Sequence, residues 1–178
     1  NAGSLTVGST GTVSGLGSFA QSAGVTQVDG TMTQSFIEIA GGVLKGTGVL
    51  SSGNTIVIGA GANVAPGNSP GTLTLDGDVS FAGELNVELA SASSYDVLNV
   101  LGMLTFESSA RINFLLDFSL TDASYHFDFL DAHGVNGYTG SMFGNPGIFG
   151  GYSSSLTCTN GGCDLDLTRM TAAPVPEP

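Results

Sequence analysis

The side chains with the greatest chemical potential in this sequence are carboxylates. Three acidic pairs are separated by even intervals, so the members of each pair share one face of an extended strand. They are Asp76 and Asp78, Glu84 and Glu88, and Asp164 and Asp166. Paired acids can carry out glycoside hydrolysis. These acids alternate with apolar residues, which places them on the solvent face of their strands. We therefore predict no catalytic residues and no enzymatic activity.

The remaining reactive side chains are two histidines and two cysteines. His126 and His133 have no Ser or Cys nucleophile motif near them, which favours a surface role in both cases. Cys158 and Cys163 flank a Thr-Asn-Gly-Gly segment, and Asn-Gly is a turn dipeptide, so a hairpin should place the two cysteines opposite each other. The arrangement predicts a disulfide and therefore an oxidising compartment.

Metal binding has few candidates in the sequence. Two thiols without further Cys partners do not make a zinc site. Asp122, Asp128 and Asp131 surround a predicted strand and are the candidates for Ca²⁺, together with carbonyl oxygens from nearby Gly turns. No Asp-x-Asp-x-Asp-Gly loop or glycine-aspartate repeat is present, so the expectation is no cofactor, with calcium as the alternative.

Composition narrows the class of protein and its partners. The 178 residues include 28 glycines but only 10% charged residues, which is typical of a secreted β-protein and not of a helical fold. Three basic residues against fifteen acidic ones give a net charge of −12, which disfavours nucleic acids and anionic membranes. The sequence has no long apolar run, shows no signal peptide and begins at Asn1, so we interpret it as a processed chain.

The elements that must position these side chains are short strands. Apolar and polar residues alternate in segments such as Phe36 to Ile39 and Thr55 to Ile58, and Gly residues recur between the segments. Glycine pairs at 41–42 and 46–48 favour the tight corners of a coil. We predict an all-β fold in which residues 1–118 form a Gly-rich parallel β-solenoid, or β-helix. For the second half, a β-sandwich remains an alternative, because alternation alone does not distinguish the two.

The C-terminal third changes character. Tyr125 to Leu130 alternates as one more strand, residues 131–151 read as a Gly-rich loop, and the cysteine hairpin follows. We predict that residues 119–170 form an antiparallel cap over the last turn, because an uncovered solenoid end is an exposed sheet edge. The N-terminal end shows no comparable cap. Residues 171–178 are rich in Pro and are predicted to be a linker.

Some motifs resemble a known class of proteins. The last four residues, Val175, Pro176, Glu177 and Pro178, match the start of the sorting signal of secreted bacterial PEP-CTERM proteins. The body is similar to autotransporter-associated and filamentous-adhesin-like β-solenoid repeats, in segments 41–48, 66–75 and 95–102. The resemblance implies a Gram-negative, biofilm- or matrix-forming source, export to the cell surface, and cleavage by a sorting protease of the exosortase type. It implies no catalytic activity.

Two functions follow as hypotheses. The first is a secreted structural protein of the extracellular matrix, biofilm or cell surface that assembles with copies of itself, head to tail, through exposed strand edges. The residues assigned to that contact are Leu5, Val7, Val13, Phe19, Val25, Val28 and Phe36. The alternative is a carbohydrate-binding or polysaccharide-associated module that uses a flat solenoid face and the aromatic residues Tyr138, Phe143 and Tyr152. The absence of Trp argues against that alternative.

Overall fold

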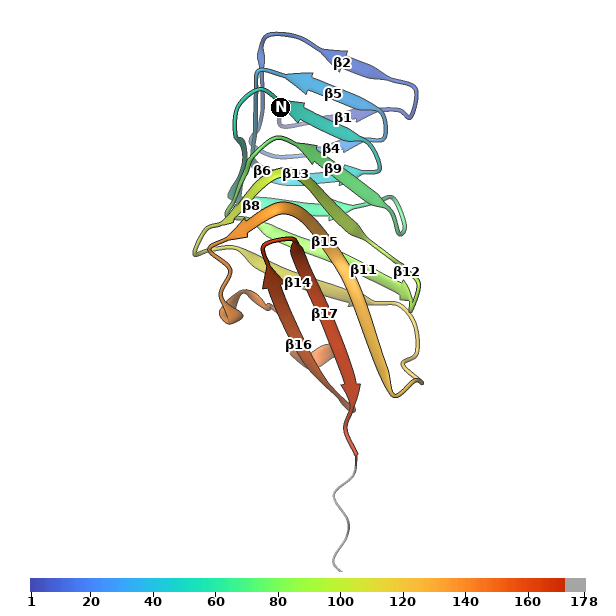
Figure 1. Cartoon of the computed structure of the whole chain (residues 1–178). Coiled ribbons are helices and arrows are strands. Elements are labelled where there is room, and N and C mark those ends of the chain that lie inside the picture. The colour runs from blue at the N-terminus through green and yellow to red at the C-terminus, as the bar shows by residue number, and fades with distance from the viewer. Residues whose placement is uncertain (172–178) are drawn as a thin grey trace, which may run out of the picture.

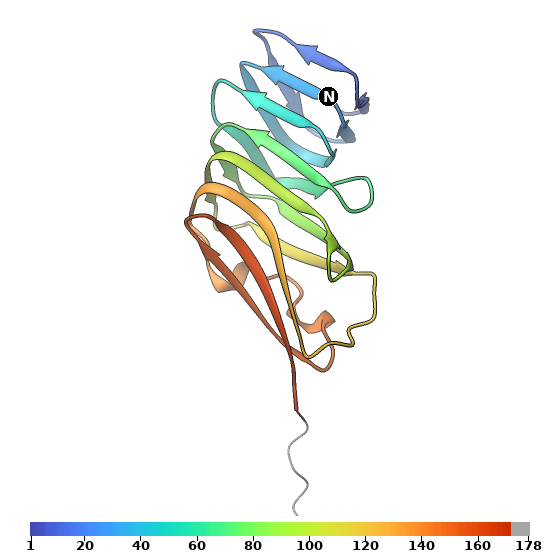
Figure 2. The ribbon, with the colours of Figure 1, turned by 45° about the vertical axis from the view of Figure 1, so that its right-hand side comes forward.

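The chain winds into a parallel β-solenoid whose C-terminal end is covered by an antiparallel hairpin (Figure 1). The computed structural model describes residues 1–171. Successive turns stack along one axis and together form three faces of parallel strands (Figure 2). The predicted fold class is therefore confirmed.

The strands follow one another turn by turn. The first turn holds β1 (Ser4–Val7), β2 (Thr12–Ser14) and β3 (Ser18–Gln21). The second holds β4 (Val25–Val28), β5 (Thr31–Gln34) and the start of β6 (Phe36–Gly46). The third holds the rest of β6, β7 (Val49–Ser52) and the start of β8 (Ile56–Pro66). The fourth holds the rest of β8, β9 (Thr72–Asp76) and β10 (Val79–Phe81).

The fifth turn leads into the cap. It holds β11 (Glu84–Ser91) and β13 (Val97–Phe106), and the short β12 (Ser94–Tyr95) folds back against β11. A partial sixth turn consists of β14 (Arg111–Leu116) and β15 (Ser124–Asn136). Two 3₁₀ turns, η1 (Gly140–Met142) and η2 (Pro146–Ile148), precede the hairpin of β16 (Tyr152–Thr159) and β17 (Gly162–Arg169).

Parallel register aligns the inward side chains of successive turns in columns. On the first face, Leu44, Val64 and Leu85 pair in sequence across β6, β8 and β11, and all three are fully buried. Each such aliphatic side chain contributes about 1.5–3 kcal/mol through burial. The core is thus one continuous stack, and along this face of residues 1–171 only the strands of the first and last turns, β1 and β14, pair on one side alone.

Two expectations from the sequence need correction. The second half is not a β-sandwich, because β10, β11 and β13 pair in parallel with the turns before them. The predicted loop at 131–151 begins later, because β15 continues to Asn136 by pairing with β13. The glycine pair at 41–42, by contrast, lies at a corner of the coil as predicted: β6 continues through it, and Gly42, with a φ of 80°, turns the chain from the part of β6 that pairs with β3 to the part that pairs with β4.

Strand β15 joins the cap to the solenoid. Its first part, from Ser124, pairs antiparallel with β17, and its last part, from Leu130, pairs parallel with β13. The predicted boundary at 118/119 falls in the connection between β14 and β15, although the strand after it serves both units. Edge-to-face aromatic contacts fill the junction, with Phe114 packed against Phe129 and Phe143.

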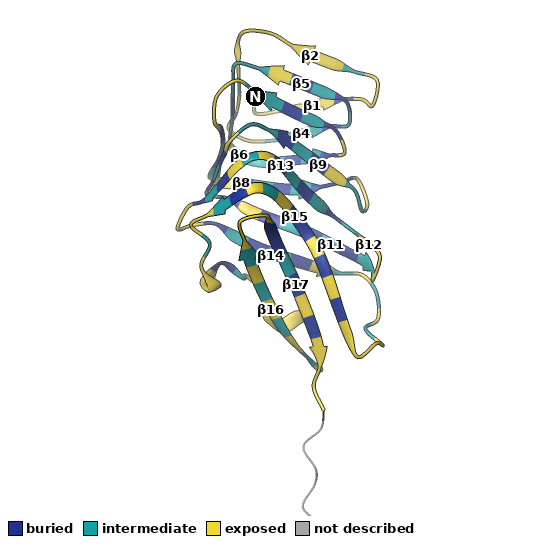
Figure 3. Ribbon diagram, in the orientation of Figure 1, coloured by how far each residue is buried: buried dark blue, intermediate teal, exposed yellow. Residues whose placement is uncertain are grey.

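Burial differs between the two ends of the solenoid (Figure 3). In the first turn, β2 is exposed at every residue, whereas the strands of the cap alternate between buried and exposed residues. Among residues 1–171, no helix has the length and apolar character needed to cross a membrane.

Candidate functional site

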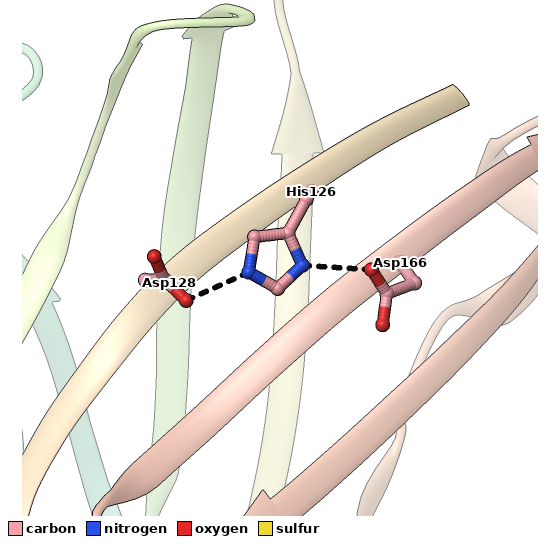
Figure 4. A network of polar contacts seen from close by, with 3 residues as sticks. All are labelled: His126, Asp128 and Asp166. Atoms are coloured by element: carbon pink, nitrogen blue, oxygen red, sulfur yellow. Dashed lines mark hydrogen bonds and ion pairs between the residues drawn. The ribbon is translucent and has the colours of Figure 1, made fainter. Parts of the chain in front are cut away.

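A histidine flanked by carboxylates lies on the outer face of the cap sheet (Figure 4). His126 on β15 lies directly opposite Asp166 on β17, and Asp128 follows two residues later on the same face. The imidazole Nδ1 is 2.7 Å from Asp166 and Nε2 is 2.9 Å from Asp128. The hydrogen bond to Asp166 is the main reason that the pKa of His126 is raised, since both contacts favour the protonated ring.

A third carboxylate extends this cluster. The ligand atoms of His126, Asp128 and Asp164 all lie within 4.8 Å of one another. Burial raises the pKa of Asp164, and a hydrogen bond with Asp128 raises it further, because the two acids share a proton more readily than they ionise together. One imidazole and two carboxylates suit a first-row transition metal better than Ca²⁺, which prefers six or more oxygen ligands.

The predicted calcium set is therefore divided by the structure. Only Asp128 belongs to the cluster around His126. Asp122 lies before β15, where its backbone carbonyl accepts a hydrogen bond from the Tyr152 hydroxyl. Asp131 lies beyond a bulge in β15 and pairs with Gly162, and His133 lies further along the same strand. In residues 1–171, Asp122 and Asp131 are not among the acidic side chains that converge with Asp128, although the bulge leaves Asp131 exposed like Asp128. Calcium binding by this set stays a prediction.

The other acidic pairs do not converge on a common point. Asp76 accepts a hydrogen bond from the Ser51 hydroxyl, whereas Asp78 accepts one from the backbone N–H of Met103, so each is used locally. Glu84 and Glu88 both point outward from β11, as the alternation predicted. The absence of enzymatic activity stays a prediction.

The cysteine hairpin forms as the sequence predicted. Cys158 and Cys163 occupy paired positions of β16 and β17 and are joined by a disulfide. Cys163 is fully buried beneath the hairpin, so the bond attaches the turn to the core of the cap. A disulfide is typical of proteins from oxidising compartments.

The residues assigned to self-association fall into two groups. Leu5, Val7, Val13 and Phe19 lie on β1, β2 and β3, each of which pairs with only one other strand in the described part of the chain. Val25 and Val28 lie on β4, which is paired on both sides, and Val28 is fully buried. Phe36 lies in the second turn on β6, beside β3. The first turn ends at Gln21. Val25, Val28 and Phe36 therefore lie in the second turn and not on the open strand edge.

The aromatic residues assigned to sugar binding are used inside the cap. Tyr138 packs against Phe106, and its hydroxyl donates a hydrogen bond to the carbonyl of Leu156. Phe143 packs against Phe114, and Tyr152 packs against Tyr125. These rings are half-buried and form no exposed platform.

A groove that the sequence did not indicate opens on the first face of the solenoid. Parallel pairing of β8 with β11 stops at Val64 and Leu85, after which β8 turns away into the segment 66–71. The opening has a volume of about 490 Å³. It is lined by Lys45, Asn63, Ala65, Pro66, Gly67, Asn68, Ser69, Asn86, Glu88, Asp96 and Leu115.

Asp96 holds the wall of this groove in place. The residue is only 4% exposed, and its two carboxylate oxygens accept the backbone N–H groups of Gly71 and Glu88, at 2.9 and 3.0 Å. Burial raises its pKa despite these bonds. The Gly67 position admits no side chain, because a Cβ atom there would lie 2.6 Å from Asp96 Oδ1. The polar turn is thus fixed against β11.

Comparisons with known proteins add no assignment, since no protein-family model matches the sequence and no curated protein is significantly similar to it. The four residues of the predicted sorting motif, Val175 to Pro178, lie outside the described residues.

Proposed function

We propose that the protein is a secreted structural subunit of an extracellular matrix, biofilm or cell surface that assembles into filaments with copies of itself. The single observation that carries the proposal is that two uncharged, singly paired strand edges lie at opposite ends of the solenoid. The disulfide agrees with an oxidising environment outside the cytoplasm.

The N-terminal edge consists of the first turn. In the described residues β1, β2 and β3 pair only with the turn that follows them. Residues 1–28 contain no Asp, Glu, Lys or Arg. Proteins protect such edges from association with charges, Pro or covering segments. Here Leu16 is 96% exposed, and no charged side chain opposes contact with another strand.

The C-terminal edge is the outer side of β16. This strand pairs only with β17 in the described residues, and no Asp, Glu, Lys or Arg occurs between residues 132 and 163. One of its carbonyl groups, on Leu156, accepts the Tyr138 hydroxyl. The two edges are different surfaces, so a contact between them is heterologous and repeats from copy to copy into a filament instead of closing as a dimer.

The test compares acidic substitutions at an edge and inside the stack. Thr12 and Thr74 lie in one outward column, because Thr12 pairs with Thr31, Thr31 with Val49, and Val49 with Thr74. Thr12 is on β2, which pairs on one side only in the described chain, whereas Thr74 is on β9, which pairs on both sides. Thr12→Asp should abolish fibres in negative-stain electron microscopy and leave monomers in light scattering. Thr74→Asp is the matched control and should leave assembly unchanged.

A third variant distinguishes the geometry of assembly. Ser153→Asp on the exposed side of β16 should also abolish fibres if the contact joins the two ends. If only Thr12→Asp has an effect, the N-terminal edges pair with each other and the head-to-tail arrangement is wrong. A wild-type protein that stays monomeric at all concentrations tested contradicts the proposal as a whole.

A further inference from the structure

The groove beside Asp96 has the properties of a built binding site. Its volume of about 490 Å³ lies in the range of small-molecule sites, about 300–1,000 Å³. Its wall is rigid, because the Asp96 carboxylate bonds the turn at Gly71 to the backbone of β11 at Glu88. The site is on the side of the solenoid, remote in the pairing order from β2, so it is independent of the proposed assembly contact.

Several polar side chains in the groove are uncommitted. Lys45, Asn63 and Glu88 make no side-chain hydrogen bond or ion pair with any residue between 1 and 171. Asn86 accepts a hydrogen bond from Asn113 through its carbonyl oxygen, at 3.2 Å, which leaves its amide NH₂ free to donate. The groove therefore offers an ammonium group, two amides and a carboxylate to a ligand.

The strand register explains why these groups converge. Lys45 on β6 pairs with Ala65 on β8, so its side chain points outward beside the end of β8. Asn86 and Glu88 point outward from the next turn on β11, and Glu88 pairs with Leu115 on β14. Because β8 leaves the sheet after Pro66, the outward residues of four turns border one opening.

We propose that this groove binds a neutral oligosaccharide. Amides and a carboxylate are complementary to hydroxyl groups, which both donate and accept hydrogen bonds. Ala65 and the 55% exposed Leu115 offer apolar surface to the C–H groups of a sugar ring. An anionic ligand is disfavoured, since the chain has a net charge of −12 and Glu88 and Asp96 border the groove.

The test uses two glutamates of one strand. Glu84 and Glu88 both lie on the outward side of β11, but only Glu88 borders the groove. Binding is measured by calorimetry and by NMR with four tetrasaccharides: β-1,4-linked glucose, α-1,4-linked glucose, β-1,4-linked N-acetylglucosamine and, as the anionic probe, galacturonate. At least one neutral probe should bind and shift the Leu115 methyl resonances.

The variants then assign the site. Glu88→Gln should weaken that binding by at least about tenfold, the effect of losing a charge-assisted hydrogen bond, whereas Glu84→Gln should leave it unchanged. Both variants should unfold at the same temperature as the wild type. Binding of none of the neutral probes, tighter binding of the galacturonate probe, or equal effects of the two substitutions would overturn the proposal. Fibre formation is unaffected by any of these outcomes.

Discussion

The two ends of the same core are built differently. In the first turn, β1 to β3 bury only Val7 and Gln21, and their outer edges are unpaired in the described chain. In the cap, β15 and β17 bury aromatic and aliphatic residues at alternate positions, and a disulfide links β17 to β16. Because each turn of a solenoid is stabilised by contacts with its neighbours, we expect the first turn to be less stable than the cap.

A first pair of substitutions tests whether the cap is the more stable end. Phe127 in β15 is fully buried, so Phe127→Ala should cost about 3–5 kcal/mol of unfolding free energy. Phe19 in β3 is half-buried at the open end, so Phe19→Ala should cost about 1 kcal/mol or less. Urea titrations of both variants measure the difference. Equal costs would show that the first turn unfolds together with the cap.

A second pair examines backbone contacts at each end. Gly24 and Gly162 both have positive φ, and a Cβ atom at either would collide with a backbone oxygen, that of Gly3 or Leu130. Gly162→Ala should lower global stability by about 2–3 kcal/mol, because the cap takes part in the main cooperative unit.

The corresponding change at the open end should act locally. Gly24→Ala should release β1 and raise its hydrogen-exchange rate, while the exchange of β15 and β17 stays unchanged. An increase in exchange throughout the molecule would contradict this, since it would mean that the first turn is needed for the rest to fold. Gly53→Ala is the control, because no atom lies near its Cβ position.

Removing the disulfide should lower the stability of the cooperative unit that includes the cap and leave the first turns unaffected. The bond joins residues five apart, and the loop-entropy relation for so short a loop gives about 2 kcal/mol. The double variant Cys158→Ser/Cys163→Ser should lose about that amount in thermal unfolding monitored by a probe in β17. Exchange in β1 to β5 should be unchanged, and a loss there would argue for coupling along the whole stack.

The smallest expected effect concerns pH. The pKa of His126 is raised in the folded state, so its contribution to stability is complete below the ordinary pKa near 6.5 and is lost as pH rises through the folded value. The pKa of Asp164 is also raised, so its contribution to stability is likewise lost as pH rises. The side chain of His126 is 55% exposed, so the change should be at most about 0.5 kcal/mol.

Thermal unfolding between about pH 6 and pH 8 measures this change. His126→Gln should remove most of the dependence over that range, whereas replacing His133 by Gln should preserve it. The opposite result, in which only the His133 variant alters the profile, would show that the carboxylates around His126 do not influence its titration.

Local patterns predicted much of the fold. Alternating residues with recurring Gly indicated the solenoid, and the Asn-Gly turn between Cys158 and Cys163 indicated the disulfide hairpin. These features depend on residues that are close in sequence. The glycine pair at 41–42 indicated a corner of the coil, but the sequence did not show that one strand, β6, continues through a residue of positive φ.

The candidate sites depend on register between distant strands and were therefore missed. His126 meets Asp166, forty residues later, only because β15 and β17 pair antiparallel at that offset. Lys45 and Glu88 border one groove because β8 leaves the sheet at Pro66. Asp96 was not singled out, because nothing in its sequence neighbours indicated that it would be buried and would accept two backbone N–H groups.

The direction of the strands has a mechanical consequence. The strands of every turn lie across the axis of the stack, and their hydrogen bonds run along it. A load applied between the first turn and the cap therefore separates the turns one after another, and does not break all the hydrogen bonds of a strand pair at once by shear. Each detached turn, such as the 18 residues from Val25 to Gly42, releases about 60 Å of extended chain. Single-molecule stretching should show a series of low steps that begins at β1, with spacings that follow the different lengths of the turns.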